Sequence, residues 1–183
     1  MKARKVKKLD PEAPLSANAA RIVRTRLEEL RGFATDALEP DASCAQHDMR
    51  IAAKRLRYVL EVTEACFGAE ATAARKAAKE LQTVLGEIHD CDVMLPRVEG
   101  EVERLQVEDA RAVLLRVDGA RDLAAHKVRE APNRGRYRGL ALLAVHLRAR
   151  RALLFERFRE FWQGEASKGT WAALERALDR PIG

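Results

Sequence analysis

Four side chains that carry or can acquire a positive charge are spaced three, four and three residues apart: His47, Arg50, Lys54 and Arg57. In an α-helix, positions three or four apart lie on the same face. Like charges on such a face repel each other by about 0.2–0.5 kcal/mol per pair, and a bound anion would remove that repulsion. Guanidinium and ammonium groups are also good donors to phosphate oxygens. The pattern therefore indicates a surface for a phosphate-containing anion, with an ordinary solvated helix face as the alternative.

The helix that must position these residues is predicted to run from about Cys44 to Phe67. Ser43 precedes it as a candidate N-cap, and Gly68 follows it as a C-terminal stop. Its apolar face lies opposite the cations and would pack in the core. That face consists of Met49, Ala52, Leu56, Val59, Leu60, Thr63 and Phe67.

Three further residues border the basic face of this helix. Arg55 lies on its flank. Glu61 interrupts the face, and it either limits the face or pairs with Arg57 or Lys54. The Tyr58 hydroxyl could donate a hydrogen bond to an anion, but we expect the Tyr58 ring to pack instead.

Basic residues recur along the other predicted helices. The first predicted helix carries Arg21, Arg24 and Arg31, with Glu28 among them. The third carries a stripe of Arg75, Lys79, Gln82, Gly86 and His89. The long C-terminal helix begins amid Arg134, Arg136 and Arg138 and carries Arg148, Arg151 and Arg159. If these helices pack side by side, their basic faces would join into one surface. The sequence leaves open which helices are neighbours.

The composition favours an all-α fold. The 183 residues are 47% hydrophobic and only 5% aromatic, and the 10 Gly and 6 Pro lie mostly between long periodic segments. We predict an antiparallel helical bundle of about six helices over residues 15–183, preceded by a flexible basic arm over residues 1–14. The expected helices end near residues 38, 67, 88, 117, 163 and 179, and Ser16 or Asn18 would cap the first.

The sequence predicts two breaks in this helical pattern. Pro96 is expected to kink or end helix around residues 92–95, so that a separate helix covers residues 97–117. Residues 119–129 could continue that helix. The segment EAPNRGRYRG around Pro132 is a break, after which the long helix would begin at about Tyr137.

Charge and cysteine content bear on partners and compartment. The net charge of +6 favours an acidic partner such as nucleic acid, polyphosphate or a membrane surface. Cys44, Cys66 and Cys91 form no C-x-x-C pair, and an odd number provides no disulfide framework. We therefore expect reduced thiols in a cytoplasmic protein. Neither a signal peptide nor a spanning segment is recognisable, so no membrane partner is expected.

Two motifs in this order resemble the CHAD family, the conserved histidine α-helical domain. The first reads H-x-x-R-x-x-x-K-R-L-R-Y from His47 to Tyr58. The second reads L-Q-x-x-L-G-x-x-H-D-x-D-V from Leu81 to Val93. The likeness is close over about residues 44–95, and it is looser in the preceding helix and in the RYRGL…FW region that follows.

The resemblance implies a helical bundle that binds inorganic polyphosphate through a basic surface, without catalysis or cofactor, in the cytoplasm or in polyphosphate granules. His47, Arg50, Lys54 and Arg57 match the motif positions and would be contacts, with Arg55 beside them. Basic residues elsewhere would add contacts: Arg21, Arg24, Lys79, His89 and Arg138. His89 stands where the family often has Arg, and Asp90 after it would orient or pair with a basic side chain.

The chain departs from the family in its second half. Family members usually carry two half-domains, each with a His-x-x-Arg helix, and this chain has one good copy. His126 and Arg129 match that spacing, but Pro132 follows too soon for a comparable helix, and His146 lacks the Arg. The chain is either a shortened member with a degenerate second half or one that completes its basic surface as a homodimer.

Other functions are open on the residues alone. RNA or DNA binding suits the charge, and some non-specific binding is expected, but aromatic side chains for stacking bases are scarce. A metal-dependent phosphohydrolase would need His47, His89 and Asp90 to converge, with His126 or His146. The cations around His47 disfavour a metal ion, so we expect no enzyme and no metal site.

A third reading is a bundle that docks a partner protein. The segment 136–163 carries Phe155, Phe158, Phe161 and Trp162 at helical spacing. Such a stripe more commonly faces the core of its own domain, and we expect that here.

Overall fold

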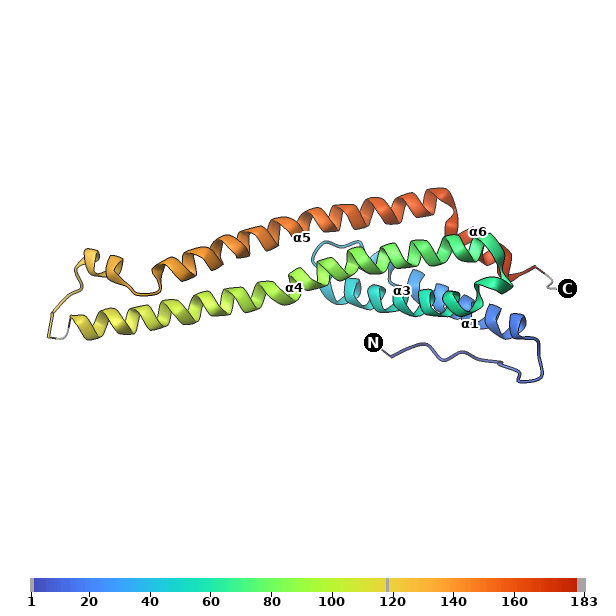
Figure 1. Ribbon diagram of the computed structural model, residues 1–183, viewed down its shortest axis with the longest axis horizontal. Helices are drawn as coiled ribbons and strands as arrows, with labels where there is room; N and C mark the ends of the chain where they lie inside the picture. The colour runs from blue at the N-terminus through green and yellow to red at the C-terminus, as the bar shows by residue number, and fades with distance from the viewer. Residues whose placement is uncertain (1, 118, 181–183) are drawn as a thin grey trace. The chain divides into compact units, whose positions relative to one another are not determined.

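The computed structural model describes residues 2–117 and 119–180 (Figure 1). Within them it contains six α-helices, two short 3₁₀ segments and no strand, which confirms the predicted all-α helical bundle. The helices are α1 Leu15–Arg31, α2 Ala34–Ala37, α3 Ser43–Thr63, α4 Gly68–Arg116, α5 Arg134–Lys168 and α6 Thr170–Leu178. The 3₁₀ segments are η1 Glu64–Cys66 and η2 Ala125–Glu130.

The described residues form two compact units. The first contains the chain up to His89 and the chain from Leu153 onward, and the second contains Asp90–Ala152. The unit boundaries fall inside α4 and α5, so each of these helices contributes to both units. The predicted division into an arm of residues 1–14 and a domain of residues 15–183 stays a prediction, and its residues 1, 118 and 181–183 lie outside the described residues.

The core of the first unit is built from the apolar faces of its helices. α1 packs along α3, and Val23, Leu27, Met49, Leu56 and Leu60 are fully buried between them and their neighbours. Other fully buried side chains come from later helices: Leu81, Leu85, Ile88, Phe158 and Leu174. The predicted apolar face of α3 is confirmed, except that Val59 is only half-buried. In the aromatic stripe that was expected to face the core, Phe155 and Phe158 are buried, whereas Phe161 and Trp162 are only half-buried.

The predicted ends of α3 are wrong for the α-helix itself: Ser43 is its first residue, with Ala42 in the N-cap position, and the helix stops before Phe67. The α-helix ends at Thr63, and η1 extends the turn to Cys66. Gly68 then adopts a φ of +68°, in the left-handed region that side chains disfavour. This conformation lets the chain leave η1 and enter α4 within a few residues.

The first predicted helix is wrong at both ends. α1 begins at Leu15 with Pro14 in the N-cap position, and neither Ser16 nor Asn18 caps it. The Asn18 side chain instead exchanges hydrogen bonds with the backbone of Asp10. The helix stops at Arg31 and restarts as α2, because Gly32, with its low helix propensity, stands at the break.

The prediction that separate helices flank Pro96 is also wrong, because α4 is one helix from Gly68 to Arg116 (Figure 1). Pro96 lies inside it. A proline removes one backbone hydrogen bond and crowds the preceding turn. Side chains on both sides of it are nevertheless packed: Cys91, Val98 and Leu105 are buried. This packing holds the helix together across the local defect.

The second unit is a helical hairpin. Residues 90–116 of α4 and 134–152 of α5 run antiparallel, as the pairing of Asp92 with Arg151 (2.7 Å) and of Glu99 with Arg148 shows. The predicted helical continuation over 119–129 is wrong, since Gly119 has a φ of +80° and only η2 follows. α5 begins at Arg134, three residues before the predicted start. Within the described part of the chain, no helix has the length and hydropathy of a membrane-spanning segment.

Candidate functional site

The cations of α3 share one face of the helix, opposite the buried Met49 and Leu56. We call His47, Arg50, Lys54 and Arg57 the basic stripe. All four side chains are half-buried. At a rise of about 1.5 Å per residue, the stripe is roughly 15 Å long.

The basic stripe contains nitrogen atoms that lack hydrogen-bond partners. His47 Nδ1, Arg50 Nε and Arg57 Nε are buried without a hydrogen bond among the described residues, although Arg57 Nε lies within ion-pair distance of Glu61, at 3.4 Å. Among the described residues, no carboxylate lies within 4.0 Å of the side-chain nitrogens of Arg50 or Lys54. An unsatisfied buried donor costs about 1–3 kcal/mol, and such groups in a folded protein call for an explanation. Oxygen atoms of an anion would satisfy them.

α4 lies against the basic stripe through two of its predicted stripe residues. The rings of His47 and His89 are 4.5 Å apart between centroids and tilted by 44°. A Cβ added to Gly86 would lie 3.4 Å from Arg50 Nε, which is van der Waals contact, so the Arg50 guanidinium lies close to the α4 backbone here. Gln82 Oε1 on the same helix is also buried without a partner. The structure therefore brings Gly86 and His89 to the basic stripe.

The environment of His47 disfavours its charged form. Burial lowers the pKa of His47 below its usual value of 6.5, and the nearby His89 and Arg50 lower it further. Asp48 acts in the opposite direction. A bound anion beside the ring would favour the protonated imidazole, so anion binding and proton uptake by His47 are coupled.

Two other residues of the predicted α4 stripe are placed differently. Arg75 Nε pairs with Glu64 Oε2 at 2.6 Å, so its charge is already compensated. Lys79 is exposed on α4, and its side chain is available to solvent. Asp90 is also exposed.

Arg55 has a carboxylate partner inside the protein. Its Nη1 lies 2.7 Å from Oε1 of Glu29, whose side chain is 1% exposed. Arg26 Nη1 pairs with the other oxygen at 2.7 Å, and the Arg4 backbone N–H donates to Oε1 at 3.4 Å. Arg55 thus ties α3 to α1 through a buried acid. The sequence pattern does not reveal this pair, because its members are 26 positions apart.

Of the two residues discussed beside Arg57, Glu61 lies where the sequence predicted, whereas Tyr58, which was expected to pack, is 47% exposed. Arg57 Nε lies 3.4 Å from Glu61 Oε1, which confirms the predicted pairing. The Arg57 guanidinium lies 4.5 Å from the centroid of the Tyr58 ring, and Lys54 Nζ lies 5.7 Å from it. Tyr58 therefore supports two cations through its ring face, as a cation–π contact.

A second cationic region surrounds Arg21 and Arg24 of α1. Together with the N-terminal segment they border a cavity of about 610 Å³. Its lining residues are Arg4, Lys5, Lys7, Lys8, Arg21, Arg24, Thr25 and Glu28. Arg21 donates to the Lys8 carbonyl, and Arg24 Nη2 pairs with Asp179 at 2.5 Å. Sequence reasoning missed the four N-terminal cations as part of a site, although the run KARKVKK at residues 2–8 was a signal.

The remaining predicted contact, Arg138, lies in the second unit, exposed near the start of α5. Three other arginines there, Arg104, Arg148 and Arg151, pair with carboxylates. His126 and Arg129, the second His-x-x-Arg match, lie in the six-residue η2 and not in an α-helix.

The described residues contain no group of three or more His, Cys, Asp or Glu side chains arranged to hold a metal ion. An HD-type phosphohydrolase, the alternative considered from the sequence, would need such a cluster, and residues 2–117 and 119–180 contain none. Cys91, beside the second His-Asp pair, is buried with Arg150 Nη1 at 3.7 Å from its sulfur.

A comparison with known protein families matches residues 2–99, more than half of the chain, to the CHAD domain. The chain belongs to the CHAD family. The matched range contains the basic stripe, His89, and the cationic region of Arg21 and Arg24, but not Arg138. CHAD domains are associated with polyphosphate binding in general. Searches of curated proteins and of solved structures found no match.

Proposed function

We propose that this protein binds inorganic polyphosphate, without catalysis, through the basic stripe. The observation that carries the proposal is a half-buried row of basic side chains in which His47 Nδ1 and Arg50 Nε have no hydrogen-bond partner among the described residues. Membership of the CHAD family supports the choice of ligand.

The chemistry of the stripe suits a linear polyanion without bases. Polyphosphate offers phosphate oxygens along its length but no aromatic surface and no base edges to read. Arg50 and Arg57 can each donate two parallel hydrogen bonds, whereas Lys54 acts as a point charge. Over the roughly 15 Å of the stripe, one stretch of polyphosphate could contact all four side chains.

We propose that the N-terminal cationic region extends this interaction. Its exposed lysines, Lys5, Lys7 and Lys8, add positive charge beside Arg21. Lys79 on α4 is a further exposed cation in the matched range. These residues would strengthen binding electrostatically, with less geometric specificity than the basic stripe.

We also propose a cytoplasmic location. All three cysteines are free thiols, as suits a reducing compartment. Polyphosphate granules are one place in the cytoplasm where the protein could act.

The proposal is tested by the triple variant Arg50→Gln, Lys54→Gln and Arg57→Gln. We expect its polyphosphate affinity, measured by calorimetric titration, to fall by at least about a hundredfold, because each charge-assisted hydrogen bond contributes about 1.5–3 kcal/mol. The matched control is Arg97→Gln, Arg104→Gln and Arg111→Gln, which removes the same charge from α4.

The control should keep its affinity within about threefold, since distant surface charges are screened by salt. Circular dichroism would verify that both variants are folded. Equal losses in the two variants would mean that overall charge, and not the basic stripe, governs binding.

A further inference from the structure

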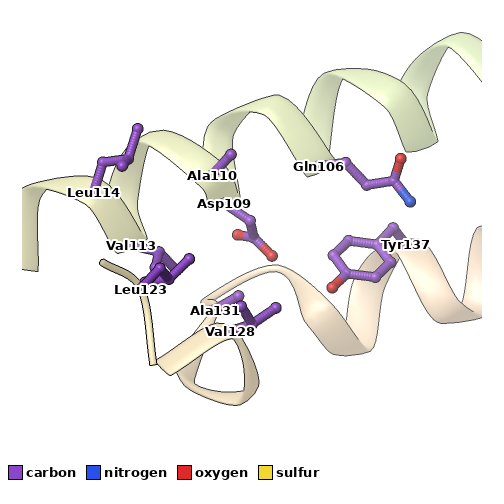
Figure 2. A pocket seen from close by; sticks show the side chains of 9 residues that line it. All are labelled: Gln106, Asp109, Ala110, Val113, Leu114, Leu123, Val128, Ala131 and Tyr137. Atoms are coloured by element: carbon purple, nitrogen blue, oxygen red, sulfur yellow. The ribbon is translucent and has the colours of Figure 1, made fainter. Parts of the chain in front are cut away.

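The second unit contains an apolar cavity that the proposed function does not use. It has a volume of about 370 Å³ and lies between α4, the segment after it and the first turn of α5 (Figure 2). Its apolar walls come from Ala110, Val113, Leu114, Leu123 and Val128. All of these residues follow position 99, where the match to the CHAD domain ends.

One buried carboxylate lines this apolar cavity. Asp109 is 4% exposed, and its Oδ1 accepts a hydrogen bond from the Asn133 backbone N–H at 2.9 Å. Its Oδ2 is buried and has no partner among the described residues. Figure 2 shows the carboxylate pointing from α4 toward the segment that leads into α5, on the side of the Tyr137 ring.

The charge of this carboxylate is not balanced from within the cavity. No described residue that lines the cavity is basic. Two cations of the surrounding segments are engaged elsewhere: Arg116 donates to the Glu130 carbonyl, and Lys127 pairs with the Glu130 carboxylate at 3.3 Å. A buried charge without a partner destabilises a folded protein unless something compensates it. A cationic ligand would supply that compensation.

We propose that this cavity binds a small organic amine, in which a primary ammonium group is attached to an apolar body. The ammonium donates a charge-assisted hydrogen bond to Asp109 Oδ2. The apolar body lies against Val113, Leu123 and Val128, and the Tyr137 ring offers a cation–π contact. The volume lies in the range of small-molecule sites, roughly 300–1,000 Å³. The site is independent of polyphosphate binding.

The test uses the full chain and three probes that share a phenyl ring and carry a positive, a neutral or a negative polar group: 2-phenylethylamine, 2-phenylethanol and phenylacetate. Binding is measured by titration calorimetry and by ligand-observed NMR. We expect the amine to bind saturably, at least about tenfold more tightly than the alcohol, because its bond to Asp109 is charge-assisted. Phenylacetate should not bind, since its carboxylate would face the Asp109 carboxylate.

Variants locate the binding to the cavity. Asp109→Asn keeps the side-chain shape but removes the charge, and we expect it to weaken amine binding by at least about tenfold. It should leave alcohol binding nearly unchanged. Glu103→Gln, which alters an exposed carboxylate on the same helix, should leave amine binding unchanged.

Three results would overturn the proposal: equal binding of the amine and the alcohol, no binding of any probe, or undiminished amine affinity in Asp109→Asn. The comparison of amine and alcohol on the unaltered chain decides the matter even if the Asp109 variant does not fold.

Discussion

Arg104 on α4 lies between two carboxylates, those of Glu101 and Glu108, whereas Arg50 on α3 has no carboxylate within 4.0 Å among the described residues. Both arginines lie on helix faces rich in charge. On α4, acids and bases alternate at spacings of three and four, so the face neutralises itself. On α3 the corresponding neighbours are His47, Lys54 and Arg57, and the face keeps its positive charge.

The comparison shows that the partner, and not the residue type, decides what an arginine does. Arg104 forms ordinary solvent-exposed ion pairs, which contribute little to stability. Arg50 is half-buried against Gly86, with a donor that lacks a partner, and is therefore suited to a ligand. Arg55, one residue after Lys54, has a structural role, since it pairs with the buried Glu29.

Among the further tests of this difference, the largest expected effect is the weakening of polyphosphate binding by salt. Polyphosphate held by four cations should release counterions with a log–log slope of about −3, taking about −0.7 per contact as for single strands. Raising salt from about 50 to 200 mM should therefore weaken polyphosphate binding roughly 50-fold. Fluorescence titrations at several salt concentrations would measure the slope. A slope near zero would contradict a site built from the basic stripe.

Single substitutions should separate the ligand-facing arginine from the structural one. Arg50→Gln should lower polyphosphate affinity by about tenfold and leave stability nearly unchanged. Arg55→Gln should lower the free energy of unfolding by about 1–3 kcal/mol, because Glu29 would lose a partner in a buried place, and should change affinity less. Urea denaturation and calorimetric titration measure the two quantities. The reverse pattern would place Arg55, and not Arg50, in the site.

The smallest predicted effect is the change of polyphosphate affinity with pH. Burial, His89 and Arg50 hold the pKa of His47 below 6.5 in the free protein, while a bound anion would raise it. Affinity should therefore rise a few-fold as pH falls from about 8 toward 6, with proton uptake, and level off below the free pKa. His47→Gln should flatten this profile, as affinity measurements across pH would show. A profile that persists in the variant would show that His47 is not the group responsible.

The same pKa shift has a consequence for stability in the absence of polyphosphate. Between the lowered pKa of His47 in the folded state and about 6.5, the unfolded chain binds more protons than the folded one. The contribution of His47 to stability is therefore lost as pH falls through this window. Thermal denaturation of the free protein at pH 7 and pH 5, compared with His47→Gln, would detect it.

The part of this molecule that the sequence predicted well is the face of a single helix. A period of 3.6 residues places Met49, Leu56 and Leu60 on one face of the helix. It places His47, Arg50 and Lys54 on the opposite face, whichever elements pack against the helix. Local signals also worked where backbone geometry is decisive, as at Gly68 with its positive φ. Pro96 misled the prediction because tertiary packing on both sides of it outweighs a local defect.

Contacts between distant segments were beyond such reasoning. The pairing of Arg55 with Glu29, the approach of His89 to His47 and the gathering of Lys5 and Lys7 near Arg21 depend on how helices and the N-terminal segment pack. The carboxylate of Asp109 was likewise unremarkable in sequence, within a helix rich in acids. Its significance comes from burial in an apolar cavity.

The measurement that tests the central claim most directly is a titration of the purified protein with long-chain polyphosphate, duplex DNA and single-stranded RNA at equal phosphate concentration, at two salt concentrations. We predict a preference for polyphosphate that persists at the higher salt, with no release of orthophosphate. Equal binding of all three polyanions, lost together at the higher salt, would contradict a dedicated polyphosphate site and leave the face of α3 as a solvated basic surface. Release of orthophosphate would contradict the non-catalytic assignment.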